Sequence, residues 1–223
     1  MSDNNIYIYG YGGMATLFHH IAKKNGLSIA GFCIEDTFFN PQTIENLPLK
    51  RYSEIVAENK QQAIDLYIAV GPTKMNHVRE KIYKMAKGDG INTPNFICQS
   101  TFELPPYSIG DGNIILNSGV IHSGATIGDN NFLSSSVTLG HGVTLGNGNF
   151  FAGGVIVAGE ATIQERCFFG LGVTISDNIT IADESFIGQG CAITKNTEQG
   201  STYTPAAYKK QKFKSDRFCD LVF

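Results

Sequence analysis

The sequence of 223 residues lacks tryptophan and contains no apolar run that approaches the roughly 20 residues of a membrane span. Its first residues, MSDNN, do not have the composition of a signal peptide. There is no excess of basic residues either, since the net charge is -3. These absences argue against membrane insertion and against nucleic acid as a partner.

Cysteine is scarce and irregularly spaced. The five cysteines are an odd number and form no CxxC pair: Cys33, Cys98, Cys167, Cys191 and Cys219. A disulfide framework or a zinc site would require paired spacing. We therefore expect reduced thiols in a cytoplasmic protein without a metal site.

Glycine, in contrast, is abundant, with 25 residues, and from residue 109 onward every sixth residue is apolar. The series has fifteen members: Ile109, Ile115, Ile121, Ile127, Leu133, Leu139, Leu145, Phe151, Val157, Ile163, Phe169, Ile175, Ile181, Ile187 and Ile193. A fixed short period indicates stacked units that bury their apolar faces against one another. Turn-forming stretches such as GDNN and GNGN separate these positions and suit corners. The pattern predicts an all-β domain, a parallel β-helix with a continuous interior ladder.

The first 98 residues follow a different pattern. We expect strands at 5–10, 28–36 and 63–71, and helices at 14–26 and 73–86. This alternation predicts an α/β domain with a βαβ-type parallel sheet, equivalent to half of a Rossmann-like dinucleotide fold. The segment NFICQSTFELPP, with its two prolines, marks the connection. The predicted domains are therefore 1–98 and 99–223.

A glycine turn follows the first expected strand. Gly10, Gly12 and Ala15 match the GxGxx[G/A] pattern, and Glu35 and Asp36 end the next strand about 20 residues further on. The alternative is a turn whose glycines serve packing alone. Because one βαβ half has room for one nucleotide, the turn favours a mononucleotide ligand, and NAD-dependent oxidoreduction is a distant alternative.

His141 interrupts the repeat VTLGHGVTLG at a corner of the expected β-helix, outside its interior. The corner residues that stack with it at intervals of 18 are Ser123, Gly159, Asp177 and Lys195. From the residues alone His141 is either a catalytic base, for which histidine is suited near neutral pH, or a solvated turn residue. The other histidines are interpreted as structural or solvated: His19, His20, His77 and His122.

Over almost its full length the chain resembles the bacterial sugar N- and O-acyltransferases. The segments that carry the resemblance are IYIYGYGG, IED, IAVG, VREKIY and CFFGLGVTISDNITIADESFIGQGCAITKN. This family joins a small nucleotide-binding α/β domain to a hexapeptide-repeat, left-handed β-helix, which implies about five coils here. It includes N-acetyltransferases of nucleotide-linked 4-amino-4,6-dideoxy sugars and sialic acid O-acetyltransferase-like proteins.

The resemblance implies a sugar-nucleotide site in residues 1–98. The residues that would hold the sugar nucleotide are Gly12, Gly13, Met14, Glu35 and Asp36. Met14 departs from the family, because relatives often have a histidine there.

The resemblance also makes His141 the general base, which takes a proton from the sugar amine or hydroxyl as it attacks the thioester of acetyl-CoA. Gly159 is expected to offer a bare backbone N–H to the thioester oxygen that becomes negative. Relatives usually follow the histidine with an acidic residue, but this chain has Gly142. One hypothesis is that Glu160, one coil further, supplies the missing acid; the alternative is a solvated corner glutamate.

Three residues match positions that meet coenzyme A or its acyl group in the family. Leu171 and Gln189 stack 18 apart on another corner, where contacts are made mainly by the main chain. Phe150 replaces a histidine near the acyl group; it would favour a longer acyl chain, or it simply packs between coils. Basic residues at 209–217 suit the phosphates of the coenzyme, or they form a solvated tail.

The resemblance implies a homotrimer, in which coenzyme A lies between the β-helices of adjacent subunits. Together with the residues above, it predicts an acyl-CoA-dependent transferase. The predicted reaction is N-acetylation of a nucleotide-linked amino sugar destined for a surface polysaccharide or glycoprotein. Sugar O-acetylation is the first alternative, but the missing acidic neighbour favours the amine, which is the better nucleophile. A non-catalytic sugar-nucleotide-binding protein on the same scaffold is the second alternative.

Overall fold

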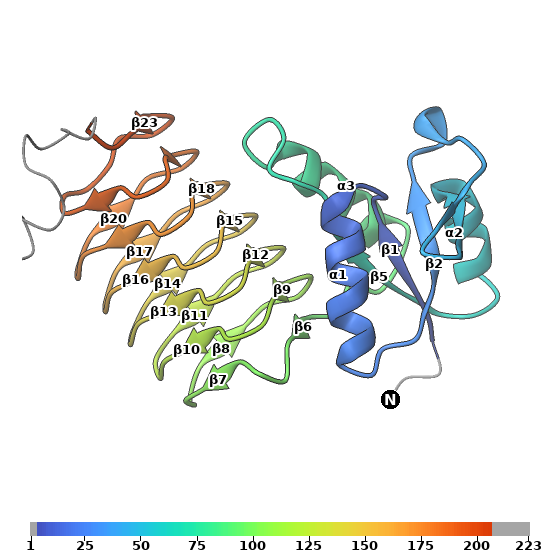
Figure 1. The fold of residues 1–223 in the computed structure, drawn as a ribbon, viewed down its shortest axis with the longest axis horizontal. Coiled ribbons are helices and arrows are strands. Elements are labelled where there is room, and N and C mark those ends of the chain that lie inside the picture. Colours follow the sequence, from blue (N-terminus) through green and yellow to red (C-terminus); the bar gives the residue numbers. More distant parts are fainter. Residues whose placement is uncertain (1–3, 207–223) are drawn as a thin grey trace, which may run out of the picture.

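The structure, a computed structural model, describes residues 4–206, so Cys219 and the basic tail at 209–217 lie outside the described residues. Two domains lie side by side (Figure 1): a sheet with helices on both faces, and a prism of stacked short strands. Within residues 4–206, no helix is long and apolar enough to cross a membrane.

The N-terminal sheet has the strand order β3-β4-β2-β1-β5 and is parallel except for the β3–β4 pair. Its elements are β1 Asn5–Tyr9, α1 Gly13–Lys24, β2 Ile29–Ile34, the 3-10 turn Asp36–Phe38, β3 Thr43–Ile44, β4 Leu47–Arg51, α2 Tyr52–Asn59, β5 Ile64–Ile68 and α3 His77–Gly88. Helix α1 packs on the sheet face turned toward the prism, whereas α2 and α3 pack on the opposite face. The predicted βαβ-type sheet is confirmed, and β3, β4 and α2 are additions that the sequence pattern did not predict.

The prism consists of two-residue strands that pair in parallel with strands one coil away, as Ile121 pairs with Leu139. The first face contains β7 Phe102–Glu103, β10 Val120–Ile121, β13 Thr138–Leu139, β16 Ile156–Val157, β19 Thr174–Ile175 and β22 Ala192–Ile193. The second face contains β8 Ser108–Ile109, β11 Thr126–Ile127, β14 Thr144–Leu145, β17 Thr162–Ile163 and β20 Thr180–Ile181. The third face contains β6 Phe96–Ile97, β9 Ile114–Ile115, β12 Phe132–Leu133, β15 Phe150–Phe151, β18 Phe168–Phe169, β21 Phe186–Ile187 and β23 Thr202–Tyr203.

The interior of the prism is the predicted apolar ladder. Every member of the six-residue series packs there, and only Ile109, in the first coil, is half-buried. Each fully buried side chain of this kind stabilises the fold by roughly 1.5–3 kcal/mol relative to exposure. The predicted β-helix is thus confirmed, and its first strand begins at Phe96, close to the predicted boundary between residues 98 and 99.

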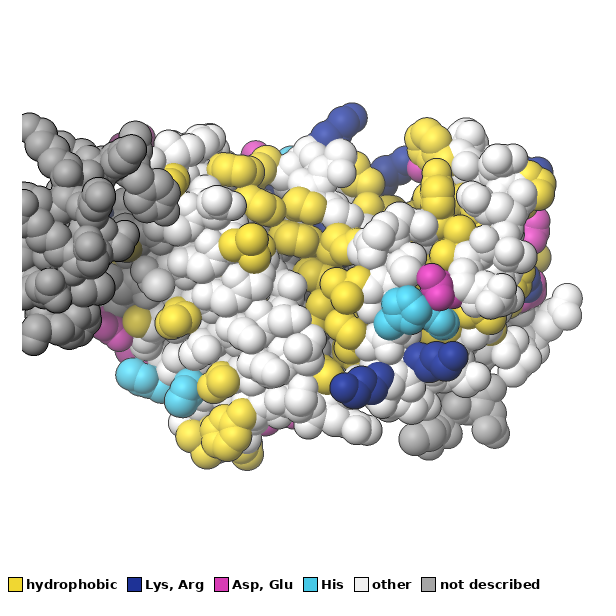
Figure 2. All heavy atoms as spheres, viewed as in Figure 1, with side chains coloured by type: hydrophobic (Ala, Val, Ile, Leu, Met, Phe, Trp, Pro, Cys, Tyr) yellow, Lys and Arg dark blue, Asp and Glu magenta, His cyan; other side chains and the backbone are white. Residues whose placement is uncertain are grey.

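The third face packs against the N-terminal domain, and hydrophobic side chains gather where the two domains meet (Figure 2). On this face, outward-pointing phenylalanine rings stack from coil to coil. The ring centroids of Phe132 and Phe150 are 5.0 Å apart, those of Phe150 and Phe168 are 5.8 Å apart, and those of Phe168 and Phe186 are 4.7 Å apart. Phe18 of α1 belongs to the same buried cluster, so this aromatic column helps to fix one domain on the other.

Hydrogen bonds from α3 also connect the two domains. The guanidinium of Arg79 is fully buried. Within its own domain it donates hydrogen bonds to the carbonyls of Ile68 and Val70, at and just after the end of β5, at 3.0 and 3.1 Å. It also donates to the carbonyl of Asn130 in the prism, at 3.2 Å. Burial lowers its pKa to about 10, so it remains charged at neutral pH. Asn76 donates to the carbonyl of Cys167, two coils further along (3.0 Å). The start of α3 is therefore anchored at two levels of the β-helix.

Candidate active site

His141 lies between β13 and β14, on the prism edge where the first face meets the second. Its side chain is exposed, and its imidazole lies directly over Gly159 of the next coil. A Cβ atom at Gly159 would be 2.6 Å from Nε2 and 2.7 Å from Nδ1 of that ring. Because no real Cβ approaches a ring so closely, only glycine permits this position of the imidazole. The residues that follow one another here at intervals of one coil are called the His141 edge: Ser123, His141, Gly159, Asp177 and Lys195.

The backbone N–H of Gly159, expected to be bare, is occupied in this structure. It donates to Oδ1 of Asp177, one coil further along the His141 edge, at 3.0 Å. Asp177 stacks on this edge at the expected interval of 18 residues, and its sequence position alone predicts no role for it. A ligand oxygen that is to accept this N–H must compete with a carboxylate.

Glu160 lies close to the position of the missing acid without forming an ion pair with His141. An added Cβ at Gly142 would be 2.6 Å from Cδ and 2.8 Å from Oε2 of Glu160. Among the described residues, histidine ion pairs involve His20 and His77 and not His141. The carboxylate of Glu160 thus lies beside the residue that follows His141, and its effect on the imidazole remains a prediction.

The glycine turn between β1 and α1 separates into two kinds of glycine. Gly10 has φ +114°, and a Cβ there would be 2.9 Å from the carbonyl oxygen of Ala69, so the fold itself requires glycine. A Cβ at Gly12 or Gly13 would meet nothing within 4 Å, and both residues are exposed. Packing therefore does not explain why glycine occupies positions 12 and 13. The close approach of a ligand to the first turn of α1 would explain it. Met14, half-buried, borders this opening toward Gly71.

The two acidic residues that follow β2, Glu35 and Asp36, make different contacts. Asp36 accepts the backbone N–H of Ser53 (3.1 Å) and its hydroxyl (2.5 Å), and so caps the start of α2. These hydrogen bonds hold the pKa of the Asp36 carboxyl below its usual range. Glu35 is half-buried and lies 3.5 Å from Nζ of Lys81. Glu35 and Asp36 line one shallow pocket beside the start of α2, and the glycine turn does not contribute to its lining.

The three residues assigned to coenzyme A do not lie on the His141 edge. Leu171 and Gln189 are exposed on the edge between the third and first faces. Phe150 is 9% exposed within the aromatic column, in a cluster against which Met14 also packs. This burial favours the packing interpretation of Phe150 over an acyl-binding one.

The two halves of the predicted site lie on different sides of the chain. The N-terminal domain, including α1, which begins at the glycine turn, covers the third face of the prism. The His141 edge joins the first and second faces and is therefore the edge opposite the third face. One chain does not bring its own glycine turn to its own His141.

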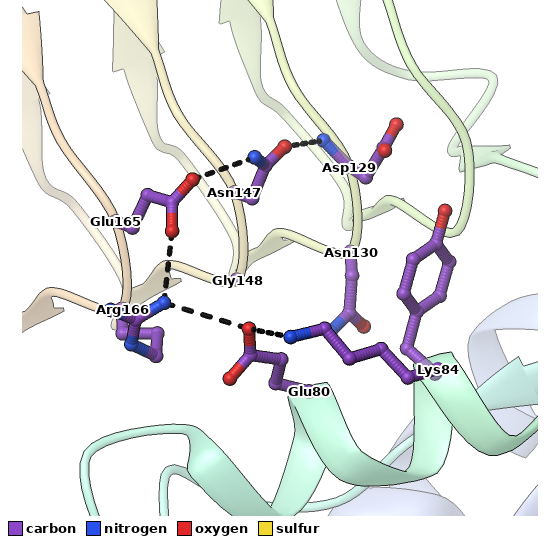
Figure 3. A pocket seen from close by; sticks show the side chains of 9 residues that line it. Glu80, Lys84, Asp129, Asn130, Asn147, Gly148, Glu165 and Arg166 are labelled. Atoms are coloured by element: carbon purple, nitrogen blue, oxygen red, sulfur yellow. Dashed lines mark hydrogen bonds and ion pairs between the residues drawn. The ribbon is translucent and has the colours of Figure 1, made fainter.

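A pocket between α3 and the prism is occupied by mutually paired charges (Figure 3). Arg166 Nη1 lies 3.5 Å from Glu80 and 2.9 Å from Glu165, and Lys84 lies 2.6 Å from Glu80. The pocket is on the edge between the second and third faces, away from His141. We interpret it as part of the junction between the domains.

Two of the other histidines, His19 and His77, have structural surroundings. His19 is buried beside Phe32, and burial lowers its pKa. His77 pairs with Glu184 at 3.2 Å. Within residues 4–206, no group of three or more His, Cys, Asp or Glu side chains could hold a metal ion.

Comparison with known proteins gives a family match for the first domain and structural matches for the whole chain. Residues 5–86 match the PglD N-terminal domain. Comparison with the curated proteins finds no significant match.

Three solved structures share the arrangement of both domains. The acetyltransferase domain of PglB from Neisseria gonorrhoeae, in complex with acetyl coenzyme A, has a TM-score of 0.80 at 20% identity; the match covers 90% of this chain and 96% of that one. A histidine-to-asparagine variant of perosamine N-acetyltransferase from Caulobacter crescentus, in complex with CoA and GDP-perosamine, has a TM-score of 0.82 at 21% identity, covering 94% and 99%. WeeI from Acinetobacter baumannii has a TM-score of 0.80 at 22% identity, covering 89% and 95%. Residues 5–86 thus match the PglD N-terminal domain, and the chain as a whole shares the two-domain fold of these three structures.

Proposed function

We propose that this protein transfers an acetyl group from acetyl-CoA to the amino group of a nucleotide-linked amino sugar. The observation that carries the proposal is the exposed imidazole of His141, held over Gly159 on a β-helix edge. The fold supports it, since similar structures include one in complex with acetyl coenzyme A and one in complex with CoA and GDP-perosamine.

In this reaction His141 acts as the general base. The sugar nitrogen attacks the thioester carbon while the imidazole takes the amine proton; the C–N bond forms, the C–S bond breaks, and the proton passes to the departing thiolate. A base of this kind contributes about 10²- to 10⁴-fold in rate. The Gly159 N–H is the donor that faces the developing negative oxygen, once it is released from Asp177.

The sugar nucleotide would bind at the glycine turn. Gly12 and Gly13 leave the first turn of α1 open, and no acidic residue lies in that turn, so its N–H groups suit a diphosphate. Glu35 is the acidic residue better placed for a sugar or ribose hydroxyl, because Asp36 already caps α2.

The active site would be shared between chains. Because the glycine turn and the His141 edge lie on opposite sides of one prism, the sugar nucleotide held by one chain would meet His141 of another. We therefore propose a homotrimer, in which coenzyme A lies between adjacent β-helices, where Leu171 and Gln189 are exposed on a neighbouring edge.

Two alternatives make different predictions. An O-acetyltransferase would need a more strongly oriented base, and no described carboxylate pairs with His141. A non-catalytic sugar-nucleotide-binding protein would account for Gly142 and for the occupied N–H of Gly159. Such a protein need not bind coenzyme A.

The test is thiol release from acetyl-CoA with GDP-, UDP- and dTDP-linked amino sugars, for wild type, His141→Asn and His122→Asn. His122 is the matched control, because it lies one coil earlier near the same prism edge. Release with one sugar that is lost only in His141→Asn supports the proposal and identifies the substrate. Failure to bind coenzyme A would favour the binding protein.

A further inference from the structure

The hydrogen bond between Gly159 and Asp177 lies where the proposed reaction needs a donor. Asp177 Oδ1 accepts the Gly159 N–H at 3.0 Å, while the imidazole of His141 lies over the same residue. The base and the donor are thus side by side, and a carboxylate already holds the donor. An acyl carbonyl that reaches Gly159 must displace it.

We propose that Asp177 determines the affinity for the acyl donor by competing with the thioester oxygen for the Gly159 N–H. The inference rests on the proposed function, because it needs an acyl group delivered beside His141. It goes further by assigning a role to a residue outside the base, the nucleotide turn and the coenzyme positions.

The physical basis is the unequal strength of the two acceptors. An ionised carboxylate accepts a stronger hydrogen bond than a neutral carbonyl. A thioester carbonyl in the ground state therefore gains little by replacing Asp177. The oxygen of the transition state carries negative charge and competes on more equal terms, so the donor favours the transition state over the bound substrate.

Exposure makes the displacement feasible. Asp177 is exposed, so its carboxylate returns to water when it leaves Gly159. A solvated charge requires no new protein partner, and hydrogen bonds at exposed positions are weak enough to exchange. Asp177 can therefore release the Gly159 N–H without rearrangement of the coil, because the backbone hydrogen bonds between coils on either side of Asp177 hold the coil in place.

The same bond at another edge provides the comparison. Asp183 Oδ1 accepts the backbone N–H of Glu165, also 18 residues earlier, at 2.7 Å. That bond lies on the edge between the second and third faces, away from His141. Side-chain caps of this kind support corners of the prism, and only the cap at Gly159 also lies under His141.

The experiment is a calorimetric comparison of acetyl-CoA and CoA binding to the full-length wild type, Asp177→Ala, Asp177→Asn and Asp183→Ala. CoA has no thioester oxygen, so its affinity reports every part of the site except the Gly159 N–H for which Asp177 and the acyl group compete. We expect Asp177→Ala to bind acetyl-CoA about three- to tenfold more tightly with unchanged affinity for CoA. Asp177→Asn should lie between, because its amide oxygen still accepts but is uncharged, and Asp183→Ala should leave both affinities unchanged.

The outcomes separate this inference from the function on which it rests. If CoA binds and the ratio of the two affinities is the same in all four proteins, the role of Asp177 is overturned and the transferase proposal stands. Weaker binding of acetyl-CoA to Asp177→Ala would also overturn it, since Asp177 would then help to hold the acyl group. If neither ligand binds the wild type, both proposals fail together.

Discussion

The carboxylate of Glu160 occupies the space that a side chain at position 142 would need, with Oε2 only 2.8 Å from where a Cβ of Gly142 would stand. Gly142 has φ +64°, a conformation that glycine adopts without strain. An acidic residue directly after His141 would therefore meet both backbone strain and a collision. The absence of an acidic residue at position 142 is therefore linked to Glu160, whose carboxylate fills the space that such a side chain would need.

This relationship predicts that Glu160→Gln lowers kcat. Loss of the charge beside the His141 turn should weaken the stabilisation of the imidazolium, at a cost smaller than the roughly 10²- to 10⁴-fold that a general base contributes in full. The measurement is thiol release at saturating substrates. Glu54→Gln, at an exposed glutamate of α2, is the control and should retain full activity. Unchanged turnover in Glu160→Gln would make Glu160 a solvated corner residue.

Gly159→Ala should reduce activity while leaving the fold intact. The added methyl group would collide with the imidazole of His141, and the exposed ring would swing away from the coil. Misplacement of a catalytic group by about 1 Å costs roughly 10²-fold in rate. Gly88→Ala, at the end of α3, is the control, because a Cβ there would meet nothing within 4 Å. Equal activity of the two variants would contradict a precise role for the imidazole.

The two kinds of glycine in the turn predict opposite results. Gly13→Val projects into open space, so we expect a change in the free energy of unfolding within about 0.5 kcal/mol. Its KM for the sugar nucleotide should rise at least about tenfold, because the side chain would stand where the diphosphate approaches. Gly10→Ala, against the carbonyl of Ala69, should instead destabilise the protein. An unchanged KM in Gly13→Val would move the nucleotide away from this turn.

Arg79→Met should destabilise the protein more than any exposed substitution on α3. It would leave the buried carbonyls of Ile68, Val70 and Asn130 without their charged donor, at a cost of about 3 kcal/mol. Denaturant titration measures the change, with Lys84→Met as the exposed control on the same helix. A loss no larger than that of the control would show that the aromatic column alone holds the junction.

The sequence predicts the parts of this fold that repeat. A six-residue period places each apolar residue in the interior because every coil is built in the same way. The same period therefore predicts the burial of both Ile121 and Ile187. β3 and β4 escaped prediction since they are short and irregular, with Pro48 inside β4.

In the candidate site, too, the repeated positions are predictable from the sequence, whereas individual contacts are not. The spacing of 18 places Asp177 in line with His141, but no spacing reveals which backbone N–H a carboxylate accepts. Arg79 also gave no signal, because an arginine on a helix ordinarily faces water, and only the packing of two domains encloses it. Contacts that depend on how separate elements meet lie beyond what a local pattern encodes.

Mixed oligomers test whether the active site is shared between chains. His141→Asn retains the glycine turn and Gly13→Val retains the base, so neither variant alone has both halves of the site. In randomly mixed trimers each site would take its turn from one chain and its histidine from the next, so about a quarter of the sites would be intact. Co-expression of the two variants, followed by thiol release at a sugar-nucleotide concentration well below the raised KM, gives the measurement. Activity that stays at the level of the separate variants would place both halves in one chain, since no chain in the mixture carries both.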